Sequence, residues 1–241
     1  MKVVAVRGND SFSQLLREGG VEVINAELVD TQVLDELRGL EERIERLDEY
    51  DGVFFTSPVA AGVFIDRVQA PVRPVLYALG NRAATALRKA GFHVETRGDA
   101  NTANEMLSKL GTQRFDGKKL LFIRGERSMD TIRERLSGIA DLDEVVVYRT
   151  IGIELSKETE RQIRVLLTNN EVGWVCFFSP SAAEAFEKRF GIPSASVASI
   201  GETTAGIAKT LGFNVGLVAS RAVNEVFAAE LIAAIKEKEI A

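Results

Sequence analysis

The chain contains, at positions 55–61, the run Phe55-Thr56-Ser57-Pro58-Val59-Ala60-Ala61, which returns as Phe177-Phe178-Ser179-Pro180-Ser181-Ala182-Ala183 at an offset of 122 residues. Gly80-Asn81 returns as Gly201-Glu202 at an offset of 121, and Val4-Ala5-Val6-Arg7-Gly8 aligns with Leu121-Phe122-Ile123-Arg124-Gly125 at an offset of 117. These repeats predict two similar α/β halves with a cleft between them.

At 241 residues, of which 46% are hydrophobic, the chain is long enough to form two domains with their own cores. No apolar run approaches the roughly 20 residues that a membrane-spanning helix needs. Lys2 and Arg7 interrupt the first apolar segment too early for a signal peptide. We therefore expect a cytoplasmic protein that makes no contact with a membrane.

The net charge of −5 argues against a nucleic-acid partner, because nucleic-acid-binding surfaces are normally basic. The one cysteine, Cys176, excludes an internal disulfide and lies in an apolar run, where an inert core residue is expected. The one histidine, His93, is expected at the surface or at a strand edge, and the chain has too few soft ligands for an ordinary zinc site.

Short apolar, β-branched runs alternate with amphipathic stretches, which is typical of strand-helix units that build parallel sheets. The predicted strands are Val3–Arg7, Val21–Ala26, Gly52–Thr56, Val72–Leu79, Val94–Thr96, Leu120–Arg124, Val145–Thr150, Trp174–Phe178, Ser196–Ile200 and Asn214–Val218. The predicted fold class is therefore α/β, with two similar parallel-sheet domains.

The repeat leaves two domain divisions open. If each half folds by itself, the boundary lies near Asp116-Gly117. If the chain instead crosses between the domains twice, the first domain comprises residues 1–29 and 153–241, and the second comprises residues 33–149. Segments 27–33 and 148–155 then form a pair of connecting strands, which fits the polar stretch that precedes a long helix at both places.

Ligands of open parallel α/β sheets bind at the carboxyl ends of the strands, so the strand-to-helix turns are the candidate binding positions. Ser57 and Ser179 each precede a proline, a pattern typical of a helix N-cap with proline at the first helical position. Capping alone explains both serines; alternatively, these turns also offer hydroxyl and amide groups to an anion. Gly80 and Gly201 end strands, where a missing Cβ lets a ligand or a neighbouring backbone approach closely.

An arginine ends the first strand of each half, at Arg7 and at Arg124, which Gly125 follows. Either side chain can pair with a carboxylate through two parallel hydrogen bonds or take part in a structural salt bridge. Tyr148 lies near the end of an apolar strand, where a packed ring with a satisfied hydroxyl is the usual interpretation. No Walker-type loop occurs and no G-x-G-x-x-G follows a strand, which disfavours nucleotide binding.

Taken together, the motifs resemble the uroporphyrinogen-III synthase family. The resemblance rests on the two Phe-x-Ser-Pro-x-Ala-Ala turns, on Ile200-Gly201-Glu202-Thr203-Thr204-Ala205, on Leu211-Gly212-Phe213-Asn214-Val215 and on Val145-Val146-Val147-Tyr148-Arg149-Thr150. Each motif is weak alone, but their order and spacing from Arg7 to the final helix are specific. The family fold implies two α/β domains joined by a two-stranded connector, with both chain ends in the first domain and a cleft between the domains.

The resemblance implies an enzyme of tetrapyrrole and haem biosynthesis, a lyase that uses no metal or cofactor. Its substrate would be hydroxymethylbilane, a linear tetrapyrrole with eight carboxylates, which loses water and closes to uroporphyrinogen III with its fourth pyrrole ring inverted. Members of the family are usually monomers. A transient contact with hydroxymethylbilane synthase would deliver the unstable substrate.

By the same resemblance, Tyr148 matches the family tyrosine proposed to donate a proton or a hydrogen bond to the departing hydroxyl group. The substrate carboxylates would be bound at the strand ends by Arg7, Ser57, Gly80, Asn81, Arg124, Gly125, Ser179, Ser181, Gly201, Thr203 and Thr204. Val59, Ala83 and the neighbours of Arg7, which are Val6 and Gly8, depart from the family pattern. At those positions we therefore expect backbone amides to bind the substrate carboxylates.

Two other classes of protein stay open at this level. One is a cytoplasmic ligand-sensing module that closes around a small anion without turnover. Tight tetrapyrrole binding without turnover would favour it. The other is a nucleotide- or flavin-binding protein built on flavodoxin-like domains, against which the absence of a bound chromophore would count.

Overall fold

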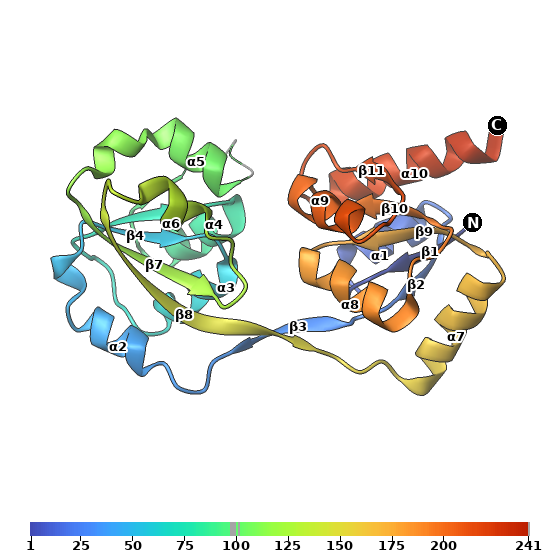
Figure 1. The fold of residues 1–241 in the computed structure, drawn as a ribbon, viewed down its shortest axis with the longest axis horizontal. Helices are drawn as coiled ribbons and strands as arrows, with labels where there is room; N and C mark the ends of the chain where they lie inside the picture. The colour runs from blue at the N-terminus through green and yellow to red at the C-terminus, as the bar shows by residue number, and fades with distance from the viewer. Residues whose placement is uncertain (97–99, 101, 241) are drawn as a thin grey trace. The chain divides into compact units, whose positions relative to one another are not determined.

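The computed structural model describes residues 1–96, 100 and 102–240. Its contacts divide the chain into two compact units: unit 1 is Met1–Asp30 with Ile151–Ala241, and unit 2 is Thr31–Thr150. Both units are built on parallel sheets with helices packed against them (Figure 1). The predicted α/β fold class is confirmed.

Unit 1 contains a five-stranded sheet in the order β11-β10-β9-β1-β2, in which every neighbouring pair is parallel. The strands are β1 (Lys2–Ala5), β2 (Glu22–Asn25), β9 (Val172–Phe177), β10 (Ser196–Ser199) and β11 (Val215–Val218). The helices are α1 (Ser11–Glu18), α7 (Lys157–Thr168), α8 (Pro180–Phe190), α9 (Glu202–Thr210) and α10 (Asn224–Ile240).

Both faces of this sheet are covered, and the first strand shows why its sequence is apolar throughout. Val4 belongs to the core that the sheet forms with α7, α8 and α9, whereas Val3 and Ala5 belong to the core formed with α1 and α10. Successive side chains of a strand point to opposite faces of the sheet. When helices cover both faces, every side chain of the strand is buried, and the strand is apolar at every position.

Unit 2 contains a six-stranded sheet in the order β3-β8-β7-β4-β5-β6, whose pairs from β8 to β6 are parallel. The strands are β3 (Val29–Val33), β4 (Gly52–Phe55), β5 (Val75–Ala78), β6 (Val94–Glu95), β7 (Lys119–Gly125) and β8 (Asp141–Gly152). The helices are α2 (Arg38–Ile44), α3 (Pro58–Ile65), α4 (Asn81–Lys89), α5 (Ala103–Leu110) and α6 (Thr131–Leu136), with 3₁₀ turns η1 (Leu47–Glu49) and η2 (Thr112–Phe115). Helices α2, α3 and α4 pack on one face of the sheet, and α5 and α6 pack on the other.

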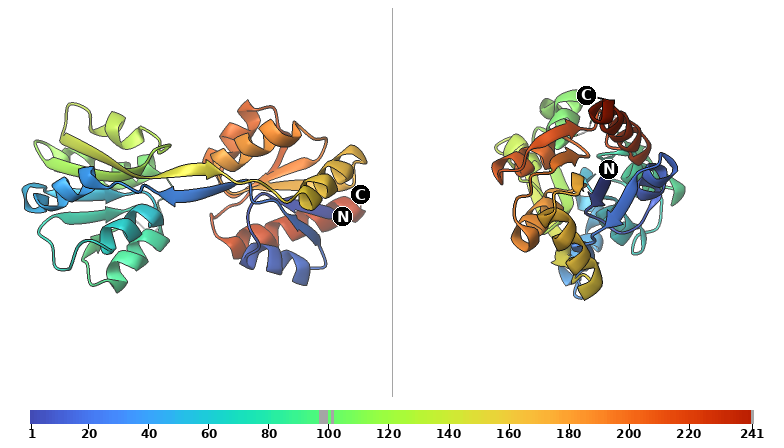
Figure 2. Two further views of the ribbon diagram at one scale, coloured as in Figure 1. Left: turned by 90° about the horizontal axis from the view of Figure 1, so that it is seen from below. Right: turned by 90° about the vertical axis from the view of Figure 1, so that its right-hand side faces the viewer.

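Strands β3 and β8 run side by side in opposite directions (Figure 2). The amide of Leu34 donates to the carbonyl of Val147 at 3.0 Å, and the amide of Ile153 donates to the carbonyl of Leu28 at 2.9 Å. The boundaries of the two units fall inside these two strands. The predicted connecting segments, 27–33 and 148–155, contain β3 and the last residues of β8.

Two predicted strands begin three or four residues away from their observed first residue. The strand predicted from Val72 begins at Val75, directly after Pro74, because proline has no amide to donate to a sheet ladder. The strand predicted from Val145 begins at Asp141. Its charged opening is stabilised by partners from elsewhere in unit 2, since Asp143 pairs with Arg43 at 2.6 Å.

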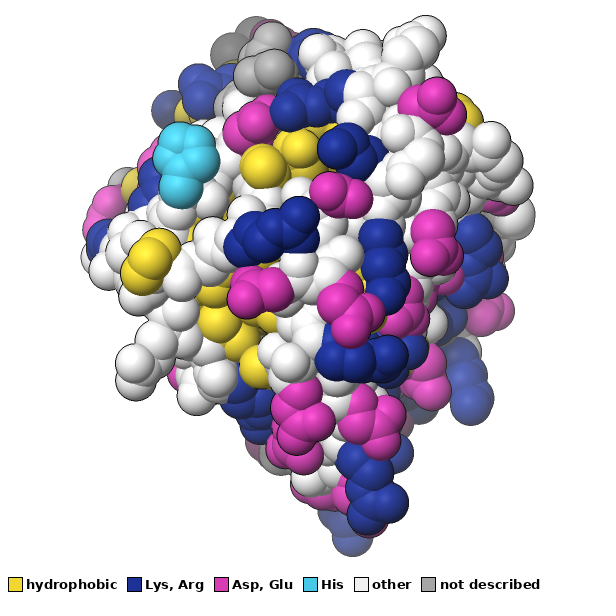
Figure 3. All heavy atoms as spheres, turned by 90° about the vertical axis from the view of Figure 1, so that its left-hand side faces the viewer, with side chains coloured by type: hydrophobic (Ala, Val, Ile, Leu, Met, Phe, Trp, Pro, Cys, Tyr) yellow, Lys and Arg dark blue, Asp and Glu magenta, His cyan; other side chains and the backbone are white. Residues whose placement is uncertain are grey.

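The residues with reactive side chains lie as expected. Cys176 is fully buried, and burial raises the pKa of its thiol well above the usual range, whereas His93 is exposed. On the face shown in Figure 3, acidic and basic side chains interleave. No helix in the described part of the chain combines the length and the apolar composition needed to span a bilayer.

Candidate functional site

Each sheet contains a topological switch point, where connections leave in opposite directions. In unit 1 the chain runs from β1 to β2 on one side and from β9 to β10 on the other, so the switch lies between β1 and β9. In unit 2 it runs from β7 to β8 on one side and from β4 to β5 on the other, so the switch lies between β4 and β7. Ligands of such sheets bind outside the carboxyl ends of the strands at the switch point.

Some of the predicted site residues lie at these two points. Arg7 and Ser179 follow β1 and β9 in unit 1, whereas Ser57 follows β4 and Gly125 ends β7 in unit 2. The switch points therefore coincide with the Ser-Pro turns and the Arg-Gly strand ends of the repeat, whereas the turns at Gly80 and Gly201 follow the neighbouring strands β5 and β10.

Arg7 is anchored at the switch point of unit 1 by contacts on several sides. Its guanidinium pairs with Asp10 at 2.6 Å, donates to Asn224 at 3.2 Å and lies over the ring of Phe178, 4.2 Å from the ring centroid. The side chain is about one quarter exposed. The guanidinium of Arg7 is therefore held beside the end of β9 as a partly exposed member of an ion pair with Asp10.

The serines of both Ser-Pro turns cap the helices that follow. Ser57 Oγ accepts from the amide of Val59 at 3.1 Å, and Ser179 Oγ accepts from the amide of Ala182 at 3.2 Å. Ser179 also shares a hydrogen bond with the hydroxyl of Ser181 at 3.0 Å. All three serines are partly exposed.

The two glycine turns leave helix N-termini without a side-chain cap. Gly80 precedes α4 with φ of +80°, a conformation that favours glycine, and Gly201 precedes α9 in an extended conformation. A Cβ at either glycine would meet no atom within 4 Å, so the space above both turns is open. The first-turn amides of α4 and α9 have no capping side chain and form groups suited to an anion.

Two further predicted residues flank these helix ends. Asn81 is exposed and lines a surface hollow of about 410 Å³ over α4, together with Arg82 and Lys89. On α9, Thr203 is exposed. Thr204 is only 4% exposed and faces the interior. Direct ligand contact by Thr204 does not fit the structure, because the residue is buried.

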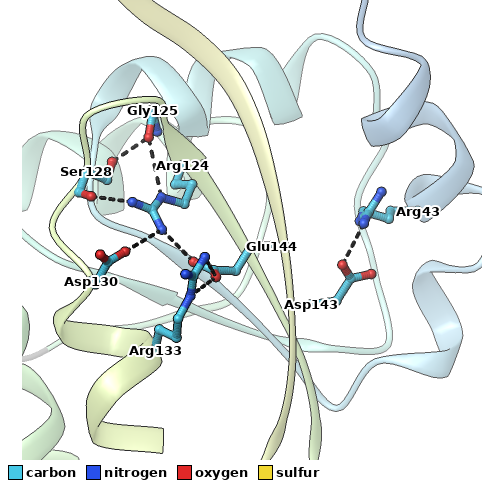
Figure 4. A network of polar contacts seen from close by, with 8 residues as sticks. All are labelled: Arg43, Arg124, Gly125, Ser128, Asp130, Arg133, Asp143 and Glu144. Carbon is cyan, nitrogen blue, oxygen red and sulfur yellow. Dashed lines mark hydrogen bonds and ion pairs between the residues drawn. The ribbon is translucent and has the colours of Figure 1, made fainter. Parts of the chain in front are cut away.

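Arg124 has a different role from the predicted one. Its side chain is 8% exposed and bonded to Glu144 at 2.7 Å, to Asp130 at 3.2 Å and to the carbonyl of Ser128 (Figure 4). Glu144 also binds Arg133. The guanidinium is committed to internal partners, so direct contact with a ligand carboxylate is not retained and Arg124 instead holds the loop that follows β7.

That loop fixes Gly125. Ser128 Oγ accepts from the amide of Gly125 at 3.0 Å, and the amide of Glu126 donates to the carbonyl of Tyr148 at 2.9 Å. In unit 1, the side chain of Asn25 holds the corresponding glycine, because its amide donates to the carbonyl of Gly8 at 3.2 Å. The prediction did not include Ser128 or Asn25, and nothing in their local sequence distinguishes them from other polar turn residues.

Gly125 and Tyr148 are in direct contact. The register of β7 and β8 shifts after Arg124, so that Gly125 lies opposite Tyr148. A Cβ built on Gly125 would lie 2.4 Å from Cε2 and Cζ of Tyr148 and 2.7 Å from its hydroxyl oxygen. The ring is thus seated on the bare backbone of Gly125 and packs partly against the core of unit 2.

The hydroxyl of Tyr148 makes no hydrogen bond with any residue that the structure describes, and the residue is partly exposed. A buried tyrosine usually has its hydroxyl satisfied by the protein, whereas a partly exposed one can offer its hydroxyl to solvent or to a ligand. This phenol instead stands at the carboxyl end of the sheet with its donor and acceptor available. Over the described residues, no group of three or more histidine, cysteine, aspartate or glutamate side chains could hold a metal ion.

Comparison with known proteins extends over most of the chain. Residues 10–228 match the family model described as uroporphyrinogen-III synthase HemD. The chain is 25% identical over 185 residues to the uroporphyrinogen-III synthase of Chlorobaculum parvum, covering 71% of this chain and 74% of that protein. It is 26% identical over 162 residues to the uroporphyrinogen-III synthase of Schizosaccharomyces pombe, covering 66% of this chain and 62% of that protein.

Solved structures show the same fold. A mutant uroporphyrinogen III synthase of the extremely thermophilic bacterium Thermus thermophilus superimposes with a TM-score of 0.68 at 15% identity, covering 98% of this chain and 99% of that one. The uroporphyrinogen-III synthetase of Helicobacter pylori gives a TM-score of 0.64 at 18% identity, covering 97% of this chain and 99% of that one. Since the family model spans well over half of the sequence, the chain belongs to the uroporphyrinogen-III synthase family.

Proposed function

We propose that this enzyme of haem biosynthesis binds hydroxymethylbilane at the carboxyl edges of its sheets and uses Tyr148 to assist the departure of the substrate's hydroxyl group. The enzyme is a lyase that forms uroporphyrinogen III. The observation that carries the proposal for Tyr148 is its hydroxyl, which has no partner among the described residues although the ring is seated against Gly125.

The substrate's carboxylates require positive groups, and the carboxyl ends of the strands supply them locally in a chain of net charge −5. In unit 1 these groups are Arg7 and the first-turn amides of α9 behind Gly201. In unit 2 they are the first-turn amides of α4, behind Gly80. Anions are favoured at helix N-termini because the amides there have no intrahelical acceptor and the helix dipole adds a partial positive charge.

The hydroxyl-bearing turns complete the proposed carboxylate sites with Ser57, Ser179, Ser181, Thr203 and the side-chain amide of Asn81. Arg124 and Gly125 act indirectly, by holding the loop against which Tyr148 is seated. The chemistry needs little more, because the pyrrole nitrogen assists ionisation of the adjacent C–O bond. The protein must mainly orient the chain and donate a hydrogen bond or proton to the departing oxygen.

The test of Tyr148 is the Tyr148→Phe variant, which keeps the ring on Gly125 and removes only the hydroxyl. We expect turnover to fall by about 10²-fold, the lower end of the range for general acid catalysis, with the free energy of unfolding unchanged. Tyr50→Phe is the matched control, because the hydroxyl of Tyr50 donates to Asp143 at 2.7 Å and has no place in the proposal. Equal turnover in wild-type and Tyr148→Phe protein would remove the acid role.

The proposal extends to the setting of the enzyme. We infer a cytoplasmic monomer that binds no nucleic acid, receives its substrate in a transient contact with hydroxymethylbilane synthase and works without a cofactor. We also infer that units 1 and 2 correspond to two domains, 1–29 with 153–241 and 33–149, joined by segments 27–33 and 148–155. Proteolytic cleavage within segments 27–33 or 148–155 before any other site would support this division, and first cleavage near Asp116-Gly117 would contradict it.

A further inference from the structure

The ion pair between Arg7 and Asp10 lies at the carboxyl end of β1 in unit 1. One carboxylate oxygen of Asp10 accepts from the amides of Phe12 and Ser13 at the start of α1, at 3.1 and 3.4 Å. The other oxygen pairs with Arg7 at 2.6 Å and accepts from the side-chain amide of Asn224 at 3.1 Å. Asp10 is therefore fixed by α1 and α10, and it holds the guanidinium of Arg7 in place.

Unit 2 contains an equivalent ion pair. Arg124 is the equivalent of Arg7 in the repeat, and it pairs with Asp130, the residue before α6, at 3.2 Å. Glu144 of the neighbouring strand adds a second carboxylate at 2.7 Å, and the side chain of Arg124 is only 8% exposed. Two carboxylates thus bind Arg124 and keep it from a ligand.

The neighbouring strand of unit 1 supplies an amide where unit 2 has this second carboxylate. Glu144 lies opposite Phe122 in the register of β7 and β8, and Asn25 lies opposite Ala5 in the register of β1 and β2. Ala5 and Phe122 are equivalent in the repeat, so Asn25 occupies the position of Glu144. Asn25 donates to the carbonyl of Arg7 at 3.3 Å, and the side chain of Arg7 is 26% exposed.

The charge of Arg7 matters to substrate and product alike. Both carry the same eight carboxylates, because the reaction removes only water and closes the chain. An arginine that binds these carboxylates binds both molecules about equally, which lowers KM without raising kcat. Tighter binding of the product also slows its release, since differences in affinity lie mostly in the dissociation rate. A carboxylate 2.6 Å from Arg7 weakens the attraction of Arg7 for both molecules.

We propose that Asp10 is a positioning residue that acts through Arg7: it holds the guanidinium at the carboxyl end of β1 and limits its affinity for the tetrapyrrole carboxylates, which speeds release of the product. The inference rests on the proposed function, because it takes the tetrapyrrole as the ligand of Arg7. Every contact that carries it lies within unit 1.

The test is Asp10→Asn, which removes the charge and keeps a side chain of nearly equal strength as a helix cap. We expect the inhibition constant of uroporphyrinogen III and the KM for hydroxymethylbilane to fall together by about fivefold, the upper end for a partly exposed ion pair, while kcat does not rise. Damage to the fold would weaken binding. Tighter binding is therefore a result that a purely structural role of Asp10 does not give.

Three further variants separate the effect of Asp10 on Arg7 from other effects. Asp10→Ser also removes the charge and keeps a capping oxygen, so it should tighten binding to a similar extent. Glu22→Gln removes an exposed charge at the amino end of the same sheet and should leave both constants unchanged. In the Arg7→Gln background, which lacks the guanidinium, Asp10→Asn should have little effect.

Unchanged or weaker binding of uroporphyrinogen III by folded Asp10→Asn protein would overturn the inference while leaving the proposed function intact. Equal tightening in the Arg7→Gln background would also overturn it, because Asp10 would then repel the ligand without acting through Arg7. If wild-type protein formed no uroporphyrinogen III, the proposed function itself would fail, which is a separate and distinguishable result.

Discussion

The contact between Gly125 and Tyr148 predicts a large effect for the smallest possible substitution. Gly125→Ala places a methyl group 2.4 Å from two ring atoms of Tyr148, and carbon atoms in ordinary contact are about 3.5 Å or more apart. The ring must therefore move by about 1 Å or more, because Gly125 is held by Ser128 and by the β7–β8 ladder.

A displacement of this size is costly for a group that donates to a reacting atom. Misplacement by about 1 Å can reduce catalysis by about 10²-fold, equivalent to about 2.7 kcal/mol of transition-state stabilisation. The stability cost is expected to be smaller, because the ring is only partly buried and can move toward solvent. Overpacking at a constrained site costs about 1–3 kcal/mol, and here the lower end applies.

The assay is turnover of hydroxymethylbilane by wild-type protein, Gly125→Ala, Tyr148→Phe and the double variant, with urea unfolding of each. If Gly125→Ala acts through the tyrosine hydroxyl, the double variant should be no slower than Tyr148→Phe alone. Gly62→Ala is the matched control, since a Cβ there would meet no atom within 4 Å. A folded Gly125→Ala protein with wild-type turnover would refute the reasoning.

Two further predictions concern stability. The hydroxyl of Ser199 is buried without a partner among the described residues, and the equivalent residue of the repeat in unit 2 is the buried Ala78. Ser199→Ala should therefore raise the free energy of unfolding by about 1 kcal/mol, measured by urea titration. An unchanged or lower free energy of unfolding would show that the hydroxyl is satisfied. Burial alone would raise the pKa of Asp143, but hydrogen bonds from Arg43 and Tyr50 lower it in the folded protein. The ionised carboxylate therefore stabilises the fold above the unfolded-state pKa of about 3.9, and this contribution is lost as the pH falls through the pKa of the folded state. Asp143→Asn should therefore cost about 1–2 kcal/mol at pH 7 and progressively less below a pH of about 3.9, and a pH-independent difference would contradict the ion-pair explanation.

Strand positions could be predicted because both sheets are covered by helices, which makes each central strand a short apolar run. The start of β8 was predicted four residues too late, because the charged residues Asp143 and Glu144 resemble a loop sequence. Their charges are balanced by Arg43 and Arg124, partners 100 and 20 residues away in the chain, which a local pattern does not show.

The strand-to-helix turns of the proposed site could be identified from the repeat, but the contacts and burial of their individual side chains could not. The burial of Arg124 depends on Glu144 in the adjacent strand, and the contact of Gly125 with Tyr148 depends on a register shift between β7 and β8.

The most direct measurement is the isomer composition of the product formed from hydroxymethylbilane by the purified wild-type protein, compared with the product of spontaneous closure in a parallel sample without protein. The account predicts uroporphyrinogen III, with the last ring inverted, in excess over the symmetrical isomer I. Isomer I alone in both samples would contradict it.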